Sequence, residues 1–311
     1  MELKNILGIK YPIIQGGMAR VATGEFAAAV SNAGGMGLIA AGGIKADELR
    51  AQIRRAKELT DEPFGVNIML MDYEAEACAK VAAAEGVKFI TTGAGTPDAY
   101  MPVWKEAGVK VFPVVASVAS AKRAERGGAD GVIAEGSEAG GHIGDLTTMA
   151  LVPQVIAAVS IPVVAAGGIA SGPQMLAALS LGACGVQIGT VLLTAEECPI
   201  HKNYQQAVIK AKDIDVVAYG RISGLPVRAI RNKMARKYIA MEKEGASKEE
   251  LEKFVLGSLR KAVVEGDVEN GSLMAGQVAG MLKEVKPVQD ILDGIYEECL
   301  QTLNSMRARL G

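Results

Sequence analysis

The sequence predicts an α/β fold, namely a (β/α)8 TIM barrel with a helical lid insertion near its C-terminal end. Three observations support this prediction. Short apolar runs alternate with helical patterns through residues 11–188, glycines follow several of the helical patterns, and residues 146–195 carry no charged side chain. Regular alternation of strand and helix indicates a parallel sheet, and eight such units in this span favour a closed barrel over an open doubly wound sheet, which is the alternative.

Eight apolar runs have the length and composition of buried parallel strands. They are residues 11–15, 37–40, 64–70, 89–92, 109–115, 131–134, 163–166 and 185–188. Seven stretches between them are able to form helices, at residues 25–31, 46–59, 74–85, 99–107, 119–126, 150–159 and 174–181. Four of these helices lead into a glycine-containing turn typical of a helix C-cap, at residues 85–88, 106–109, 126–130 and 181–184.

Residues 146–195 lack Asp, Glu, Lys and Arg, which raises the question of a membrane span. Pro153, Pro162, Pro173 and several glycines divide this stretch, so no uninterrupted apolar run of about 20 residues remains. Parallel strands that helices cover on both faces produce the same uncharged pattern. We therefore expect a buried barrel and no association with a membrane.

The pattern changes after about residue 197. Residues 199–265 are charge-rich and predict helices with no clear strand, and residues 242–261 alternate acids and bases as a solvated helix does. A turn, a stretch of small residues and an amphipathic helix over residues 288–310 follow. We therefore predict a (β/α)8 barrel over residues 1–198, a helical lid insertion over residues 199–270, and a return segment with the closing helix of the barrel over residues 271–311.

Composition excludes several classes of function. The formal net charge is −2, so no global basic field is present to hold nucleic acid. The four cysteines are scattered without a C-x-x-C pair, and two histidines do not make a metal-ligand cluster, so we expect no metal site. Reduced thiols and the lack of a signal-peptide pattern at the N-terminus predict a cytoplasmic protein.

The loops that follow the strands of a barrel converge at one mouth, which is where barrel enzymes carry their active sites. The loop over residues 135–144, called the 135–144 loop below, carries Glu135, Glu138 and His142 directly after a predicted strand. This makes His142 the candidate catalytic residue, and the alternative is a glycine-rich connection whose histidine merely lies at the surface. Other candidates at strand ends are Gly17, Met18, Ala19, Asn67, Thr92, Gly93, Glu135, Gly140 and Gly141.

Barrel enzymes often bind a phosphate with the loops after strands seven and eight. Gly167 and Gly168 follow the seventh predicted strand, and Gly189 and Thr190 follow the eighth. Glycines expose backbone N–H groups, and a helix that starts there adds a favourable dipole. With few ionisable groups available, a bound cofactor would supply the difficult chemistry. FMN fits better than a dinucleotide, because no strand is followed by G-x-G-x-x-G.

At these residues the sequence resembles the flavin-dependent enoyl-acyl-carrier-protein reductases of the FabK type, which belong to a broader group that includes nitronate monooxygenases. The resemblance covers essentially the whole chain and is carried by residues 11–19, 61–67, 91–95, 134–149, 165–170, 227–230, 262–267 and 271–280. Two positions depart from the pattern, because Arg20 stands where tryptophan is usual and Ser137 where methionine is frequent.

The resemblance implies that NADH or NADPH reduces FMN, which then reduces a trans-2-enoyl thioester of acyl carrier protein, the last step of fatty-acid elongation. His142 would polarise or protonate the substrate. Gly17, Met18, Ala19, Asn67 and Glu135 would hold the flavin ring and ribityl chain, and Gly167, Gly168, Gly189 and Thr190 its phosphate. Met274 and Gln277 are expected to cover the flavin. Relatives also suggest a homodimer and a monovalent cation held by backbone carbonyls.

Two other functions stay open on the sequence alone. In a nitronate monooxygenase, His142 would act as a base on a nitroalkane, and oxygen would reoxidise the flavin. In a non-catalytic scaffold, the barrel would only bind a flavin or phosphate.

A basic cluster predicts a docking face for acyl carrier protein, which is acidic. The alternative is an ordinary solvated helix. The cluster, which we place on one helix, comprises Arg228, Arg231, Lys233, Arg236 and Lys237.

Overall fold

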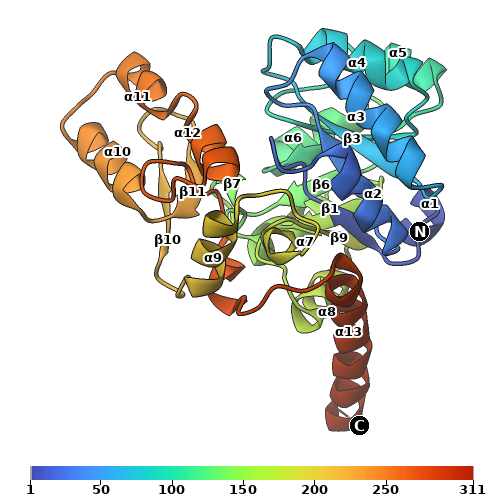
Figure 1. The fold of residues 1–311 in the computed structure, drawn as a ribbon. Coiled ribbons are helices and arrows are strands. Elements are labelled where there is room, and N and C mark those ends of the chain that lie inside the picture. The colour runs from blue at the N-terminus through green and yellow to red at the C-terminus, as the bar shows by residue number, and fades with distance from the viewer. Residues whose placement is uncertain (1, 311) are drawn as a thin grey trace.

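The computed structural model describes residues 2–310, so the outermost residues of the first and last predicted segments, 1 and 311, lie outside it. Eight parallel strands form one sheet in the order β1-β9-β8-β6-β5-β4-β3-β2. The two ends of this order meet through a single parallel bridge between Ile14 of β1 and Met36, supported by hydrogen bonds of 2.9 Å on either side of it. The sheet is therefore a nearly closed barrel surrounded by helices, which confirms the predicted fold class (Figure 1).

The barrel strands lie close to their predicted positions, and three of them, β2, β8 and β9, have the predicted bounds. They are β1 (Ile13–Gln15), β2 (Gly37–Ala40), β3 (Phe64–Met69), β4 (Phe89–Gly93), β5 (Lys110–Val115), β6 (Val132–Glu135), β8 (Val163–Ala166) and β9 (Gly185–Ile188). The helices between them are α2 (Gly24–Asn32), α3 (Ala46–Leu59), α4 (Ala75–Ala84), α5 (Met101–Glu106), α6 (Val118–Arg126), α7 (Thr148–Ile156) and α8 (Gly172–Ser180).

The barrel interior is apolar at the amino-terminal ends of the strands. Ile14, Leu38, Phe89, Phe112 and Ile133 are buried together there. The short helix α1 (Leu3–Leu7) packs its buried leucines against this cluster and closes that end of the barrel. The carboxyl ends of the strands, on the opposite side, are therefore the open mouth.

A second, smaller unit lies beside the mouth and is called the side module below (Figure 1, orange). The sequence predicted no strand in residues 199–265, and this was wrong. Strands β10 (Val216–Tyr219) and β11 (Val227–Ile230) form an antiparallel sheet with β7 (Gly141–His142), which belongs to the 135–144 loop. Each strand is only four residues or shorter, and it is pairing with segments distant in the chain that makes them strands.

The other elements of the side module are helical. They are α9 (Lys202–Lys210), α10 (Lys233–Lys243), α11 (Lys248–Val255), α12 (Ser258–Arg260) and the π-helical turn η2 (Lys261–Glu265). The basic cluster is therefore divided. Arg228 is buried on strand β11 and Arg231 lies between β11 and α10, so the prediction that all five cations lie on one helix was wrong.

The chain then returns to the barrel through the 3-10 turn η3 (Gln277–Met281) and ends in α13 (Val288–Leu310). Helix α13 packs on α8, and Gly172 of α8 allows this approach, because an added Cβ would lie 2.2 Å from the backbone nitrogen of Cys299. The far half of α13 projects from the body, where Leu300, Leu303 and Met306 are partly exposed (Figure 1). The homodimer stays a prediction. Within residues 2–310, every helix is too short or too polar to cross a bilayer.

Candidate active site at the barrel mouth

The floor of the mouth is made of inward-facing side chains near the carboxyl ends of the strands. Side chains alternate along a strand, and the apolar interior cluster contains Phe89 of β4 and Ile133 of β6. Two positions further along, Thr91 and Glu135 therefore also face inward, and the same argument places Asn67 and Gln187 on the floor. Asn67 pairs in register with Thr91 and donates a 2.9 Å hydrogen bond to its hydroxyl.

Three buried side-chain polar atoms have no hydrogen-bond partner among the described residues. They are Nε2 of Gln15, Oε1 of Gln187 and Oγ1 of Thr92. Gln187 belongs to the floor, because its register partner Ile14 lies in the interior cluster. Gln15 pairs instead with Ile188 and Thr92 with Ile68, which pack against the helices. Buried donors and acceptors without a partner are costly, and in native proteins a ligand or water usually satisfies them. The floor therefore offers the Gln187 oxygen as an acceptor to a bound ligand.

Glu135 is an unusual member of this floor. No side chain or backbone group in residues 2–310 donates a hydrogen bond to its carboxylate, and burial raises its pKa from 4.5 to about 7. The residue keeps some exposure to solvent, but its carboxylate has lost enough hydration for the pKa to rise. At neutral pH the carboxyl is therefore close to half protonated and is able both to hold and to release a proton.

We expect a Glu135→Gln variant to gain stability relative to the natural protein as the pH rises. Below about pH 4.5 the carboxyl is protonated whether the chain is folded or not, so the glutamate has no cost. Above pH 7 the folded protein holds a buried carboxylate that the unfolded chain keeps hydrated. The raised pKa should therefore cost the natural protein about 2 kcal/mol more at pH 8 than at pH 5. Urea unfolding at both pH values measures this difference, with the exposed residue Glu244 changed to Gln as control. A difference between natural and variant protein that does not change with pH would contradict it.

The 135–144 loop is fastened by Glu138. Its carboxylate accepts hydrogen bonds from the backbone N–H of Thr148 (2.9 Å) and from the Thr148 hydroxyl (3.0 Å), at the start of α7. Its backbone carbonyl accepts a 2.9 Å hydrogen bond from the N–H of Gln277 in the return segment. One residue thus ties the loop to a barrel helix and to the distant end of the chain.

His142 lies on β7, and its register partner is Val227 of β11. The side chain is exposed at the mouth, although enough protein surrounds it that desolvation lowers its pKa. The imidazole is therefore neutral at physiological pH, with one nitrogen that donates and one that accepts. Among the described residues, none forms a hydrogen bond with the ring, so both nitrogens are available to a substrate. The prediction that His142 lies at the mouth is in agreement with this geometry, and its catalytic role stays a prediction.

The predicted phosphate cradle lies on two adjacent strands, β8 and β9. Gly167 and Gly168 both have left-handed backbone conformations, with φ of 91° and 75°, which favour glycine. The hydroxyl of Thr190 accepts a 2.9 Å hydrogen bond from the N–H of Gly276, and its own proton stays free to donate. Gly168 lies near Glu138, but the carboxylate of Glu138 is already bound to Thr148.

Most of the other predicted residues gather at the same mouth. Gly17 lies against Asn67, the Met18 sulfur lies near Gly189, and the Met274 sulfur near Gly141. Gly140 packs on the backbone of Ala275, where no side chain would fit. Gly93 and Thr92 lie at the end of β4, and Gln277 reaches the loop through its backbone. Ala19, in the β1–α2 loop, lies beside Gly42 of the β2–α3 loop.

Sequence reasoning missed three residues of this site. Thr91 and Gln187 lie within apolar strands, and the period-two alternation that puts them on the interior was available in the sequence. Gly276 joins Thr190 and the backbone of Glu138, and an added Cβ there would lie 2.6 Å from the Glu138 carbonyl oxygen. That contact joins segments far apart in the chain and leaves no local signal.

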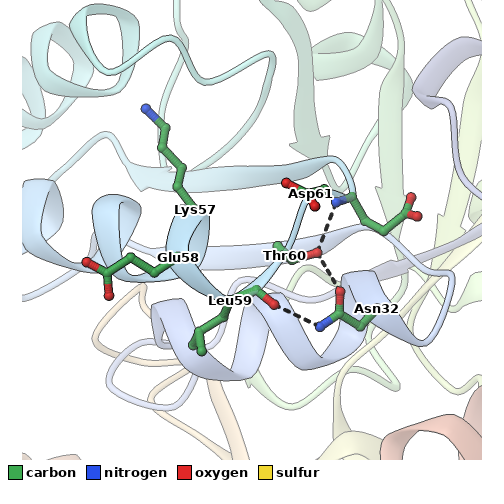
Figure 2. Close-up of a pocket in the computed structure, with 7 residues that line it drawn as sticks. Asn32, Lys57, Glu58, Leu59, Thr60 and Asp61 are labelled. Atoms are coloured by element: carbon green, nitrogen blue, oxygen red, sulfur yellow. Dashed lines mark hydrogen bonds between the residues drawn. The ribbon is translucent and has the colours of Figure 1, made fainter.

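A hollow of about 320 Å³ lies elsewhere, between the end of α2 and the α3–β3 connection (Figure 2). Figure 2 shows Asn32 donating to the Leu59 carbonyl (3.1 Å) and accepting from the Thr60 hydroxyl (2.5 Å). Because this connection leads into the amino-terminal end of β3, the hollow opens on the face opposite the mouth. Its hydrogen bonds fasten α2 to the end of α3, and we assign it no part in the site.

Comparison with known proteins shows which solved structures this chain resembles. The FabK structure from Thermotoga maritima superposes with a TM-score of 0.96 at 47% sequence identity, over 99% of this chain and 98% of that one. A nitroalkane oxidase structure from Streptomyces ansochromogenes gives a TM-score of 0.87 at 28% identity, over 98% of this chain and 99% of that one.

Relatives of this chain were also found by sequence. A probable nitronate monooxygenase from Staphylococcus saprophyticus is 31% identical over 97% of this chain and 98% of its own. An octahydro-indene-carboxyl-CoA dehydrogenase from Rhodococcus jostii is 30% identical over 98% of this chain and 97% of its own. The sequence profile named nitronate monooxygenase matches residues 1–85 and 73–298. The chain therefore belongs to the nitronate monooxygenase family of flavin-type oxidoreductases.

Proposed function

We propose that this protein is an FMN-dependent reductase of trans-2-enoyl thioesters carried by acyl carrier protein, with NADH or NADPH as electron donor. The observation that carries the proposal is the likeness to FabK from Thermotoga maritima, at 47% identity over nearly the full length of both chains. The relative from Rhodococcus jostii is named as a dehydrogenase of a carboxyl-CoA thioester, which supports a thioester substrate.

The residues of the mouth fit FMN. The unpartnered oxygen of Gln187 on the floor would accept a hydrogen bond from an N–H at the polar edge of a flavin ring. Gly17, Met18, Ala19, Asn67 and Glu135 would hold the ring and ribityl chain, with Thr92, Gly93, Gly140 and Gly141 around them. Gly167, Gly168, Gly189 and Thr190 would hold the phosphate, and Met274 and Gln277 would cover the ring. When bound, FMN would take hydride from the nicotinamide and deliver it to the β-carbon of the enoyl thioester.

The contribution of His142 follows from its neutral state. Hydride addition to the β-carbon places negative charge on the thioester oxygen, and the α-carbon must gain a proton. A neutral imidazole donates a hydrogen bond to that oxygen through one N–H, which stabilises the charge as it develops. The ring then passes this N–H proton to the α-carbon while its other nitrogen takes up a proton from water at the exposed mouth, so the imidazole ends neutral.

Glu135 acts from the floor of the mouth. Because its pKa is raised to about 7, it is able to donate a hydrogen bond to a bound ring in its protonated form. It also holds a proton within the site that ordinary carboxyl groups have lost at neutral pH.

Nitronate oxidation is the second candidate. The family profile, the staphylococcal relative and the nitroalkane oxidase structure favour it. In this reaction neutral His142 would accept a proton from the carbon beside the nitro group.

Anaerobic visible spectroscopy separates the two functions. For the reductase, we expect NADH or NADPH to bleach the oxidised flavin bands of the purified protein, and crotonyl thioester to restore them. Bleaching by an alkyl nitronate, with no bleaching by either nicotinamide, would replace the proposal by the second function. If no compound changes the spectrum, both functions fail.

A further inference from the structure

Helix α10 carries three cations along one side of its first two turns. Lys233, Arg236 and Lys237 are spaced by three and four positions, which places them next to one another on the helix surface. All three are exposed, while Met234, Ala235 and Tyr238 are buried against the side module. This group of three is called the α10 basic face below.

The charges of this face are not neutralised. No carboxylate in the described part of the chain lies within ion-pair distance of the three side chains, and Lys237 instead lies 5.2 Å from the ring centre of Phe254. Glu242, on the same helix, is turned away and accepts hydrogen bonds from Gly220 and Ile222 of the β10–β11 hairpin. Glu269 contacts the helix start through its backbone, where its carbonyl accepts a hydrogen bond from the N–H of Met234.

These cations also oppose the helix dipole. The amino-terminal end of a helix is its positive end, where acidic side chains are favoured and cations are not. The first turn of α10 has no acid. Asn232 caps the helix and anchors it, since its side chain accepts from Ala235 and donates to the carbonyls of Val268 and Gly271. A fixed helix start with unfavourable charges is a feature that folding alone does not explain.

The structure separates this face from the other two cations of the basic cluster. The Arg228 guanidinium is buried and donates to the Ser137 carbonyl (2.8 Å), so it fastens the 135–144 loop. Arg231 faces Asp215 at 3.7 Å. Only the three cations of α10 are left for a partner.

The α10 basic face is linked to the candidate catalytic residue by a short piece of chain. His142 pairs with Val227, and Lys233 follows Val227 by six positions. A chain of that length spans at most about 22 Å. A carrier protein bound at this face would therefore hold its thioester arm close to the mouth.

We propose that the α10 basic face is the docking surface for the acidic carrier protein that brings the thioester, an inference that rests on the proposed function. The chain as a whole has a net charge of −2 and therefore no general attraction for an acidic partner, so a local group of unpaired cations is where such a partner is attracted. The neighbouring helix α11 carries Glu249, Glu250 and Glu252 against Lys248 and Lys253, so it adds no net positive charge to the basic face. The positive surface is therefore confined to α10, which suits a compact acidic protein better than an extended polyanion or an anionic membrane.

The test compares two substrates that share the same enoyl thioester, one on carrier protein and one on pantetheine. In a Lys233→Glu, Arg236→Glu variant we expect kcat/KM to fall about tenfold or more with the carrier substrate and to change less than about twofold with the pantetheine substrate. The matched control is Lys122→Glu, Arg126→Glu on α6, which changes the same residue types and the same charge on a barrel helix. This control should leave both substrates unaffected.

The outcomes distinguish this inference from the proposed function. An equal loss with both substrates, or no loss with either, overturns the docking surface. The same loss in the α6 control also overturns it, because net charge alone would then explain the effect.

If the natural protein reduces neither substrate, the proposed function fails, and calorimetric titration of the carrier then decides the docking surface by itself. Binding that the α10 variant loses and the α6 variant keeps would support it, and equal binding by all three proteins would overturn it.

Discussion

Replacing His142 with alanine is expected to slow reduction of the enoyl thioester by about 10²- to 10⁴-fold, the range that a positioned acid–base group contributes. Reduction of the flavin by NADH or NADPH should keep its rate, because the proposed role of His142 concerns the thioester oxygen and the α-carbon alone. Stopped-flow absorbance under anaerobic conditions measures the two half-reactions separately. The flavin should stay bound, since no hydrogen bond of the described structure depends on the imidazole.

The second histidine of the chain provides the control. His201 caps α9 by accepting a 3.1 Å hydrogen bond from the N–H of Asn203. A His201→Ala variant should lose about 1 kcal/mol of stability, as expected for a lost cap, and keep both half-reactions. Our assignment would fail if His142→Ala left the second half-reaction intact, and it would lose its specificity if both histidine variants slowed that step alike.

The second large effect is expected at Gly17. A Cβ at this position would lie 2.2 Å from Cγ of Asn67, so an alanine must displace the Asn67 side chain, which its hydrogen bond to Thr91 holds in place. Gly17 has no left-handed backbone conformation, so the whole effect is this contact. Overpacking of this kind costs about 1–3 kcal/mol. The displaced amide would enter the space that we assign to the flavin ring, so Gly17→Ala should weaken flavin binding by roughly 10- to 100-fold.

Fluorescence titration of the protein with FMN measures this loss, and turnover should fall with flavin occupancy and recover at high FMN. Gly294→Ala on α13 is the matched control, because a Cβ there meets no atom within 4 Å. A Gly17→Ala protein that binds FMN as tightly as the natural one would remove Gly17 and Asn67 from the proposed ring site.

The barrel could be predicted from the sequence because each of its units repeats a local pattern. The strands β8 and β9 are apolar runs between helices with glycine turns, and burial on both faces makes such runs unambiguous. The side module has no such pattern. Its strands β7, β10 and β11 form through pairing between residues 141–142, 216–219 and 227–230, and pairing at this distance along the chain has no local signal. Arg228 shows the consequence, since a charged residue in a charged stretch was expected on an exposed helix and is buried on a strand.

The candidate site, like the fold, could be predicted only in part. Glycines after strands and a histidine in a loop are visible in the sequence, and the structure brings them to one mouth. What fixes them there could not be predicted. Glu138 bonds to Gln277 and Thr190 bonds to Gly276, and these contacts depend on the path of the return segment. Titration behaviour was equally hidden, because the raised pKa of Glu135 results from burial that only the folded barrel creates.

The order of strands has a consequence for how the protein is made. The first barrel strand to leave the ribosome, β1, forms its full set of ladder hydrogen bonds with the last one, β9. Until β9 has emerged, a nascent chain leaves an edge of the sheet unpaired and the apolar interior around Ile14 and Phe89 incompletely covered. Fragments that stop short of β9 should therefore associate with one another or with chaperones. Because the ring closes only when β9 is present, we expect no part of the barrel to be stable before nearly all of it has been synthesised.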